Sequence, residues 1–331
     1  MKKFLIIQTA FLGDAVLVTS IVEKLIAWYA DAEIDLVVRK GNEGLFIGHP
    51  FLNRLHVWDK RTDKTRDLLR VIKSVRRTKF DHVINCQRFF STGLMTVFAR
   101  GDEKVGYNKN PLSFLFTKTV RHIIGDGRHE VDRLNALIEH LTDGTRPMPE
   151  LHPEPWALDD IKPKLGLSGE GLTVQYVTIA PASVWFTKQW PESKWIELVK
   201  ALPKEQKVFI IGAPSDSELA QRIIAATGRG VDLTRELKLL ESAALMKGAV
   251  MNYVNDSAPL HIASAMNAPV TVVFCSTVPA FGFGPLRENG HVVETNELLA
   301  CRPCGLHGYK ACPKGHFKCA LAIDIQRVIG S

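Results

Sequence analysis

Short apolar runs alternate along this 331-residue chain with segments of helical periodicity, and this alternation restricts the fold more than any other feature. Strands that alternate with helices are typical of parallel α/β sheets. We therefore predict an α/β protein with two Rossmann-like domains. The expected strands are at 4–8, 34–38, 82–86, 176–180, 207–211, 249–254 and 270–274, and the expected helices are at 14–29, 192–202, 216–227, 239–247 and 257–266.

Four prolines between residues 147 and 155 predict a linker between the two domains, because proline suits neither helix interiors nor central strands. We place an N-terminal domain at 1–155, a C-terminal domain at 156–318 and a last helical segment at 319–331. Two α/β domains in tandem leave a cleft at the carboxyl ends of their sheets, and ligands of such folds bind there. The strand-to-helix loops are therefore the segments in which to look for functional residues.

Composition excludes several classes of protein. With 46% hydrophobic and 23% charged residues the chain is globular rather than disordered. Its apolar runs are far shorter than the roughly 20 residues of a bilayer span. The opening Lys2-Lys3 and the apolar residues after it resemble a secretory signal, but Gln8 and Asp14 interrupt that pattern. We predict a cytoplasmic protein, in which Cys86 and Cys275 are core residues.

The first candidate loop spans 9–15 and follows the first predicted strand. It contains Gly13 alone, so it lacks the dinucleotide fingerprint that a nicotinamide oxidoreductase would carry, and no Walker A lysine follows. Gly13 would allow a tight turn. Spacing alone favours Asp14 as the N-cap of the next helix. The alternative is a carboxylate that acts as a general base.

Two further loops belong to the second domain. The loop at 179–192 contains Ser183 and Lys188, and a lysine beside a strand end can contact a phosphate. The loop at 255–261 opens a helix that Asp256 or Ser257 would cap, and its N–H groups and dipole form an anion site beside His261. A solvated surface lysine and a core histidine are the alternatives for Lys188 and His261. Together the loops predict a diphosphate held by the second domain and a base from the first, as in sugar-nucleotide transferases.

These segments also resemble a known family. Leu12-Gly13-Asp14, the run 188–192 (Lys-Gln-Trp-Pro-Glu) and the run 255–265 (Asn-Asp-Ser-Ala-Pro-Leu-His-Ile-Ala-Ser-Ala) are similar to signatures of glycosyltransferase family 9, the ADP-heptose:lipopolysaccharide heptosyltransferases. The resemblance runs in order from residue 4 to about residue 328. Each motif alone is weak, and their order and spacing carry the assignment.

The resemblance implies a GT-B fold with an acceptor domain, a donor domain and a terminal helix that returns to the first. It implies metal-independent, inverting transfer, with no cofactor required for catalysis. Asp14 would be the general base and Lys188 would neutralise the departing diphosphate. The other donor contacts that it implies are Ser183, Asp256, Ser257, Ala258 and His261.

The chain departs from the family pattern in two places. An acid that can bind the donor ribose has no clear counterpart in the segment 212–216, and Ser257-Ala258 stands where the family has Thr-Gly. ADP-heptose and an acidic lipopolysaccharide core are the donor and acceptor that the resemblance implies. Another nucleotide sugar, or an acceptor other than lipopolysaccharide, is the alternative.

Four cysteines lie within nineteen residues, at Cys301, Cys304, Cys312 and Cys319. Four thiolates can hold a tetrahedral zinc or iron ion, and free thiols or a disulfide are the alternatives. A similar cysteine pattern occurs in some members of the same family, which indicates a structural rather than a catalytic feature. A non-catalytic metal-binding interaction module would be a function of a different class.

Residues 60–79 contain nine Lys and Arg residues, in a chain of formal net charge +7. Arg66, Arg70, Lys73 and Arg77 would share one helical face. Most such runs are solvated faces. The alternative is a surface that attracts an acidic glycolipid at the inner membrane, and nucleic acid is not expected because few aromatic residues interleave the charges.

Overall fold

The computed structural model describes residues 1–163, 165 and 175–330. Internal contacts divide the chain into two compact units, Met1–His152 and Pro153–Ser331. The division falls inside the proline-rich segment at 147–155.

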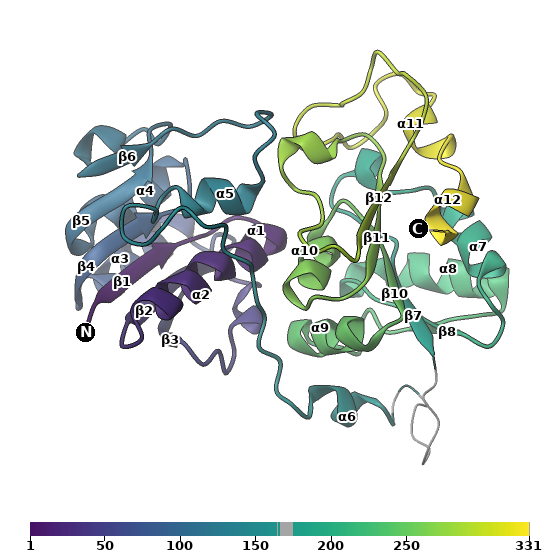
Figure 1. Ribbon diagram of the computed structural model, residues 1–331, viewed down its shortest axis with the longest axis horizontal. Coiled ribbons are helices and arrows are strands. Elements are labelled where there is room, and N and C mark those ends of the chain that lie inside the picture. The colour runs from purple at the N-terminus through teal and green to yellow at the C-terminus, as the bar shows by residue number, and fades with distance from the viewer. Residues whose placement is uncertain (164, 166–174, 331) are drawn as a thin grey trace. The chain divides into compact units, whose positions relative to one another are not determined.

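The first unit is built on a six-stranded parallel sheet of order β3-β2-β1-β4-β5-β6 (Figure 1). Its strands are β1 (Lys3–Ile7), β2 (Glu33–Arg39), β3 (Leu52–Trp58), β4 (Lys79–Asn85), β5 (Arg100–Tyr107) and β6 (Lys118–Val120). Its helices are α1 (Leu12–Leu17), α2 (Thr19–Trp28), α3 (Lys64–Val75), α4 (Phe90–Phe98) and α5 (Glu130–Asn135), with short 3-10 turns η1 (Glu43–Leu45) and η2 (Ser113–Leu115).

Alternation along β1 explains how this sheet buries both of its faces. Successive strand side chains point to opposite faces. Leu5 and Ile7 join the core under α3 and α4, whereas the Phe4 ring lies 5.5 Å from the ring of Tyr29, which ends α2. All three strand residues are fully buried. Burying a side chain of this size contributes about 1.5–3 kcal/mol, so the central strand anchors both helical layers.

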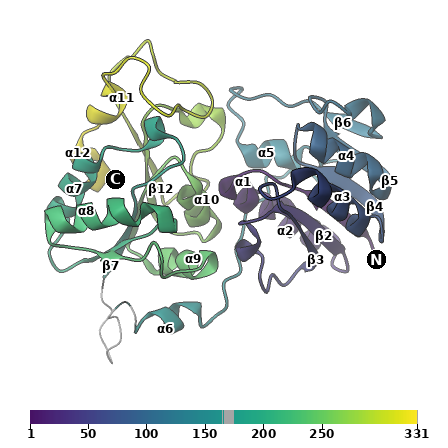
Figure 2. The same ribbon diagram turned by 180° about the vertical axis from the view of Figure 1, so that it is seen from behind.

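The second unit has a parallel sheet of order β12-β11-β10-β7-β8-β9. Its strands are β7 (Tyr176–Ala180), β8 (Lys207–Ile210), β9 (Val231–Asp232), β10 (Met251–Asn255), β11 (Val270–Phe274) and β12 (Gly290–Glu294). Figures 1 and 2 show α7 and α8 on one side of this sheet and α9 and α10 on the other. The helices and turns are α6 (Ala157–Ile161), η3 (Phe186–Lys188), α7 (Glu192–Ala201), η4 (Pro214–Asp216), α8 (Ser217–Thr227), α9 (Leu239–Gly248), α10 (Ala258–Ala265), η5 (Pro279–Phe281), α11 (Lys318–Leu321) and α12 (Ile325–Ile329).

The two sheets have the same topology. In each, the first strand of the unit pairs with the second on one side and with the fourth on the other. The strand order therefore reverses between β1 and β4 in the first unit and between β7 and β10 in the second. Ligands of open α/β sheets bind outside the carboxyl ends of the strands at such a reversal. The loops that follow these four strands are consequently where each unit can build a site.

The predicted α/β class is confirmed, and every predicted strand is present within a few residues. The predicted helix at 14–29 is two helices, because the chain bends at Val18 between α1 and α2. Cys86 and Cys275 are buried as predicted. The outer strands β3, β5, β6, β9 and β12 were not predicted.

The last segment of the chain belongs to the second unit. The helical segment predicted at 319–331 is two short helices, α11 (Lys318–Leu321) and α12 (Ile325–Ile329). Ala320 and Val328 are fully buried in the core that α7 and α8 also cover. Packing of this segment on the first unit stays a prediction. Of the helices that the structure describes, none combines the length and the apolar character needed to cross a membrane.

Candidate functional site

A lysine and a carboxylate meet at the start of α10 in the second unit. The Lys188 Nζ lies 2.7 Å from the Asp256 Oδ2, with Lys188 mostly buried and Asp256 buried. The Thr277 hydroxyl donates a hydrogen bond to the same oxygen at 2.5 Å. The carboxylate therefore fixes the ammonium group beside the amino end of a helix, where the dipole is positive.

Helix α10 begins as the sequence predicted, with Ser257 at the N-cap and Ala258 as its first residue. Within this described segment the Ser257 hydroxyl makes no capping bond to the helix, and it lies 3.4 Å from the Asn255 carbonyl oxygen. The first N–H groups of the helix are therefore not used by a side-chain cap. A helix start of this kind binds anions.

His261 and Ser183 lie on the two segments that meet here. His261 is buried one turn inside α10, and its ring makes an edge contact with Phe283 at 6.1 Å. Ser183 is half-buried in the β7–α7 loop, and its carbonyl oxygen accepts a bond from the Gln189 amide at 2.5 Å. Their contacts with a donor stay predictions.

A fully buried amide joins the β7–α7 loop to β10. The Asn255 Oδ1 accepts the Trp190 N–H at 2.9 Å, and the Asn255 Nδ2 donates to the Pro181 carbonyl at 2.8 Å. Buried amides that are satisfied in this way hold one geometry, because breaking either bond leaves a polar group unpaired. Asn255 thus fixes the loop that carries Lys188 against the loop that carries Asp256.

A pocket of about 490 Å³ opens between the loops that follow β7 and β8. The segment 212–216, which lacked a clear ribose-binding acid in the sequence, reaches this pocket through Asp216. The Asp216 carboxylate accepts the Ala213 N–H at 2.8 Å and a bond from the Ser215 hydroxyl at 3.1 Å. The other residues around it include Phe186, Gln189, Glu192, Arg222 and Phe317.

In the first unit, Asp14 does not cap α1. The helix begins at Leu12 after an N-cap at Phe11, which places Asp14 at the third helical position. The N-cap interpretation is therefore wrong, and so is a tight turn at Gly13, which lies inside the helix. Asp14 is half-buried in the first turn of α1. Its role as a base stays a prediction.

Side chains from three strand ends hold the loop before Asp14. The Lys60 Nζ donates to the Thr9 carbonyl at 2.6 Å, and the Asn42 amide donates to the Ala10 carbonyl at 3.1 Å. Gln87 donates to the side chain of Gln8 at 2.5 Å. Burial, then the charges of Arg39 and Lys64, lowers the pKa of Lys60 to about 8.

All six cysteines are free thiols in the structure, so the cysteine segment forms no disulfide there. The four clustered thiols act on one another, because burial and then Cys304, Cys312 and Cys301 raise the pKa of Cys319 to about 11. Burial and the neighbouring thiols also raise the pKa of Cys304. Sulfur donors suit a thiophilic metal, although in the described part of the chain the four Sγ atoms do not form a group within 4.8 Å of one another.

Glu23, His49 and His152 do bring their donor atoms within 4.8 Å of one another in the first unit. The Glu23 Oε1 accepts from the His152 Nε2 at 2.7 Å, and the His49 Nε2 lies 3.9 Å from the same oxygen. The Phe51 N–H donates to the His49 Nδ1 at 3.3 Å, which leaves the ring proton on Nε2. A protonated Nε2 has no lone pair for a metal, and burial followed by His152 lowers the pKa of His49 to about 4, so that ring is neutral. The group is therefore a hydrogen-bonded cluster in which the bond to Glu23 raises the pKa of His152.

Three hydroxyls near Lys188 were missed from the sequence: Thr187, Ser276 and Thr277. The sequence pattern assigns no role to Thr187, and it does not mark the residues after β11 as a site loop. The signal was present, since Ser276 and Thr277 follow a buried strand at the same sheet edge as Asn255. Polar residues at that edge are candidates for a site.

Comparison with known proteins identifies what the chain is similar to. The model of glycosyltransferase family 9 (heptosyltransferase) matches residues 68–305. Lipopolysaccharide heptosyltransferase 3 of Escherichia coli (strain K12) is 27% identical over 299 residues, which cover 84% of this chain and 83% of that protein. Lipopolysaccharide heptosyltransferase 1 of Pseudomonas aeruginosa is 23% identical over 321 residues, with 91% and 86% covered.

Solved structures share the fold. ADP-heptose lipopolysaccharide heptosyltransferase II of E. coli superposes with a TM-score of 0.80 at 21% identity, over 100% of this chain and 97% of that one. A family 9 glycosyltransferase of Veillonella parvula gives 0.86 at 21% identity, over 99% and 95%. The iron-containing dodecameric glycosyltransferase TibC of enterotoxigenic E. coli gives 0.59 at 16% identity, over 99% and 74%. The predicted GT-B fold is confirmed by these likenesses.

Proposed function

We propose, from the premise that the chain belongs to glycosyltransferase family 9 and is a glycosyltransferase, that it transfers heptose from ADP-heptose to a lipopolysaccharide core acceptor. The transfer is inverting and needs no metal for catalysis. The observation that carries the proposal is the Lys188–Asp256 pair at the start of α10, which joins a cation and a helix N-terminus in one place.

In the proposed reaction the second unit holds the diphosphate. The Lys188 ammonium and the N–H groups of Ser257 and Ala258 contact the phosphate oxygens, together with the Ser183 and Ser257 hydroxyls and His261. The Asp256 carboxylate would repel a phosphate at close range, so its part is to hold Lys188 and to present the helix start. As the bond to the sugar breaks, ADP gains negative charge, and these groups stabilise the transition state more than the ground state.

Asp14 is the base in this proposal. It accepts the proton of the acceptor hydroxyl while that oxygen forms the new bond to the anomeric carbon and ADP leaves with the bonding electrons. Attack from the side opposite the leaving group inverts the configuration. A positioned base of this kind contributes about 10²–10⁴-fold to the rate.

The deciding experiment measures ADP release and sugar transfer by the unmodified chain and by Asp14→Asn. We expect the variant to lose at least a hundredfold in turnover while ADP affinity stays unchanged, because the amide cannot accept the proton. A loss of ADP affinity in Asp14→Asn would instead place this residue in the donor site. If the chain binds metal but transfers no sugar from any donor, the alternative of a non-catalytic metal-binding interaction module would hold instead.

The donor is the least constrained part of the proposal, because the segment 212–216 departs from the family pattern. Thermal-shift measurements with ADP-, UDP-, GDP- and dTDP-linked sugars identify the nucleotide. We expect ADP-heptose to give the largest rise in melting temperature. A larger rise with another nucleotide sugar would assign the chain to a family member of different donor specificity.

The outer face of α3 supports an acidic acceptor at a membrane surface. Arg66, Arg70 and Lys73 are exposed on α3, and Leu69 between them is 61% exposed. Arg77 is also exposed, but it lies two residues beyond the end of the helix, so the prediction that it shares the helical face is wrong. An anionic lipid surface attracts basic residues by about 1 kcal/mol each. We propose that this helix face brings the cytoplasmic enzyme to the inner membrane, where a phosphorylated glycolipid acceptor is found.

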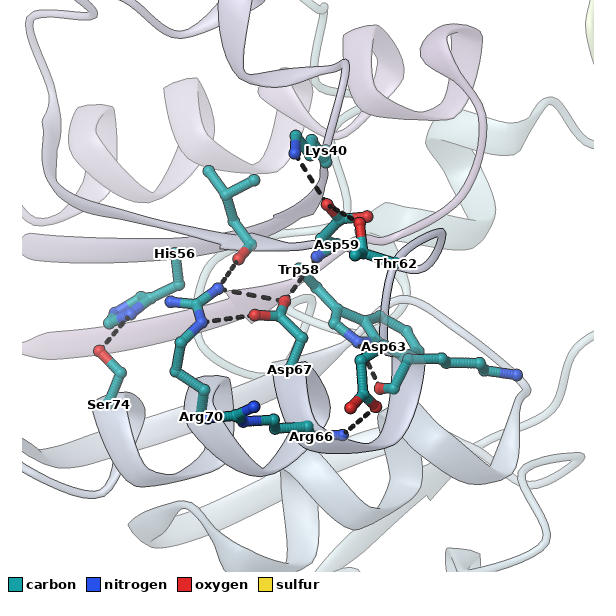
Figure 3. A network of polar contacts seen from close by, with 12 residues as sticks. Lys40, His56, Trp58, Asp59, Thr62, Asp63, Arg66, Asp67, Arg70 and Ser74 are labelled. Atoms are coloured by element: carbon teal, nitrogen blue, oxygen red, sulfur yellow. Dashed lines mark hydrogen bonds and ion pairs between the residues drawn. The ribbon is translucent and has the colours of Figure 1, made fainter.

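Contacts at the start of α3 keep this face in place (Figure 3). The Asp63 side chain caps the helix by accepting the Arg66 N–H at 2.9 Å. The Asp67 carboxylate accepts the Asp59 N–H at 2.6 Å and pairs with Arg70. One of the four cations is thereby partly neutralised, and the others remain available to an acidic partner.

We also propose that a structural metal ion is bound by four cysteines, Cys301, Cys304, Cys312 and Cys319. TibC, which shares the fold, is described as iron-containing. Zinc or iron bound by the four thiolates would cross-link the segment and take no part in the transfer. Elemental analysis of the purified chain, beside a variant with Cys301 and Cys304 replaced by Ser, tests this with one metal per chain expected and none in the variant.

A further inference from the structure

The cysteine segment, residues 301–319, is hydrogen-bonded to the turn that carries Lys188. The Thr187 N–H donates to the Tyr309 carbonyl at 3.1 Å, and the Tyr309 N–H donates to the Thr187 Oγ1 at 2.8 Å. Thr187 is 1% exposed, so both bonds are shielded from water. A reciprocal pair of this kind fixes the backbone of one segment against that of the other.

A second path joins the same turn to the first two cysteines. The Ser276 hydroxyl donates to the Thr187 Oγ1 at 3.0 Å, and the Ser276 carbonyl accepts the Cys304 N–H at 2.8 Å. The Arg302 side chain also donates to the carbonyls of Cys275 and Thr277, each at 2.7 Å. The start of the cysteine segment is thus fixed to the residues that also hold Asp256.

Gly308 makes the close approach possible. Its φ is +76°, and a Cβ placed on it would lie 2.8 Å from the Thr187 Oγ1 and 3.1 Å from the Lys188 Cγ. The first distance is shorter than van der Waals contact allows. Only glycine therefore fits between the cysteine segment and the stem of the lysine.

Lys188 is consequently held at both ends. Asp256 fixes its ammonium group, whereas the cysteine segment fixes the backbone of the preceding Thr187 and lies close to the first part of the lysine side chain. A second contact lies beside it, where the rings of Phe186 and Phe317 stack at 5.2 Å. Displacing the cysteine segment would move the whole turn from Phe186 to Lys188.

We propose that the cysteine segment is a positioning element for Lys188, in which Gly308 and Thr187 are the positioning residues. The inference rests on the proposed function, because Lys188 matters to the reaction as the cation that meets the diphosphate. It extends that function, because a segment that contributes no catalytic group then controls the rate of transfer. Electrostatic stabilisation depends on donors that are already in place, so a small displacement of the ammonium group lowers turnover.

The first experiment compares Gly308→Ala with Gly315→Ala. Both glycines lie in the cysteine segment with positive φ, +76° and +70°, so alanine strains the backbone similarly at each. No atom lies within 4 Å of a Cβ at the described position Gly315. We expect Gly308→Ala to lower kcat at least tenfold and to weaken ADP binding, whereas Gly315→Ala keeps both within about twofold.

The second experiment uses Thr187→Val and Thr187→Ser. Valine has the shape of threonine without the hydroxyl that accepts from Tyr309 and Ser276, and serine keeps that hydroxyl. We expect valine to lower kcat at least tenfold with the acceptor KM unchanged, and serine to restore it to within about threefold. A packing role alone would predict the reverse order, since valine preserves the volume better than serine.

The outcomes separate the two proposals. An unmodified chain that neither binds ADP nor transfers sugar would overturn the proposed function. In an active chain, the positioning role is overturned if Gly308→Ala and Gly315→Ala have the same turnover and ADP affinity. Should Gly308→Ala fail to fold, the threonine pair decides, and equal turnover of Thr187→Val and Thr187→Ser would count against the role.

Discussion

The two units place an asparagine at the same point of the same sheet topology and use it differently. Asn85 ends β4 and Asn255 ends β10, and both are fully buried. The Asn85 side chain donates to the Thr96 hydroxyl at 2.8 Å and accepts the Gln87 N–H at 2.9 Å, so its bonds stay in its own β4–α4 segment. Asn255 instead bonds to the neighbouring loop after β7.

The difference shows how one scaffold supports two electrostatic environments. In the first unit two amides, Gln8 and Gln87, join the loops after β1 and β4, and the Lys60 and Asn42 side chains hold the same loop before Asp14. In the second unit Asn255 joins the loops after β7 and β10, and these loops carry a lysine and a carboxylate that pair with each other. A fixed cation at a helix start suits a diphosphate, whereas the loop before Asp14 is held by side-chain amides and by the Lys60 ammonium on a backbone carbonyl.

The largest expected effect tests the difference in charge between the two units. Replacing Lys188 by Met removes the cation of the second unit, and we expect turnover to fall a hundredfold or more, about 3 kcal/mol of transition-state stabilisation. The matched change in the first unit, Lys60→Met, removes the hydrogen-bond donor to the Thr9 carbonyl and should lower turnover less than tenfold. Equal losses in steady-state assays would show that the first unit also supplies a charge.

The two asparagines provide the next test. Asn255→Leu leaves the Trp190 N–H and the Pro181 carbonyl buried without a partner, at about 1–3 kcal/mol each. Asn85→Leu should destabilise its unit by a similar amount. We expect ADP binding, measured by calorimetry on folded protein, to weaken in Asn255→Leu and to stay unchanged in Asn85→Leu. A loss of ADP affinity in Asn85→Leu would contradict the assignment of donor binding to the second unit.

Acid should destabilise the first unit through a buried histidine. His122 lies edge-on to Tyr107 with ring centroids 4.5 Å apart, and burial, followed by nearby arginine and lysine charges, lowers its pKa to about 4. The unfolded chain takes up the proton near pH 6.5 and the folded chain only near pH 4, so stability falls as the pH drops between these values. At pH 5 the loss is about 2 kcal/mol relative to pH 8.

His122→Phe removes this titration. We expect the variant to lose less stability than the unmodified chain in urea unfolding at pH 5, while the two respond equally above pH 7. His49 has its pKa lowered to about 4 by burial and then by His152, so part of the acid sensitivity remains. An unchanged pH dependence in His122→Phe would mean that this ring is not buried in its neutral form.

The smallest effect on stability comes from the exposed basic residues on α3 and just after it. Reversing Arg66, Lys73 and Arg77 to Glu should change the stability by about 0.5 kcal/mol or less per site, because all three side chains are exposed. Binding to vesicles that contain anionic lipid should be lost. The matched control reverses the charge of three exposed lysines of the second unit. An equal loss of vesicle binding in the control would mean that net charge, and not this surface, causes the binding. Those lysines are Lys200, Lys204 and Lys247.

The sequence predicted the central strands better than the outer ones for a physical reason. Strands β7 and β11 are buried on both faces and appear as apolar runs that one threonine each interrupts, Tyr176–Ala180 and Val270–Phe274. Strand β5 contains Arg, Asp, Glu and Lys residues, because much of its length is only partly buried. A charged strand of this kind has no apolar periodicity to detect.

Side-chain pairing in the site was harder to predict than its location. The loops with Lys188 and Asp256 were identified from strand ends and motifs, but the 2.7 Å pair joins residues 68 positions apart in the chain. Its formation depends on which way each side chain points. The N-cap of α1 was missed because Phe11 occupies a position where a polar residue is preferred. The contacts of Thr187 lie in an irregular segment without periodicity.

Trp190 gives the molecule an intrinsic optical reporter. Its indole is 1% exposed, its N–H group donates to the Ala320 carbonyl at 3.2 Å, and its ring packs edge-on against Trp195 at 5.2 Å. Its backbone lies two residues after Lys188 and is bonded to Asn255. Nucleotide occupancy should therefore change the blue-shifted part of the intrinsic fluorescence, and titrations can follow ligand docking without an added dye.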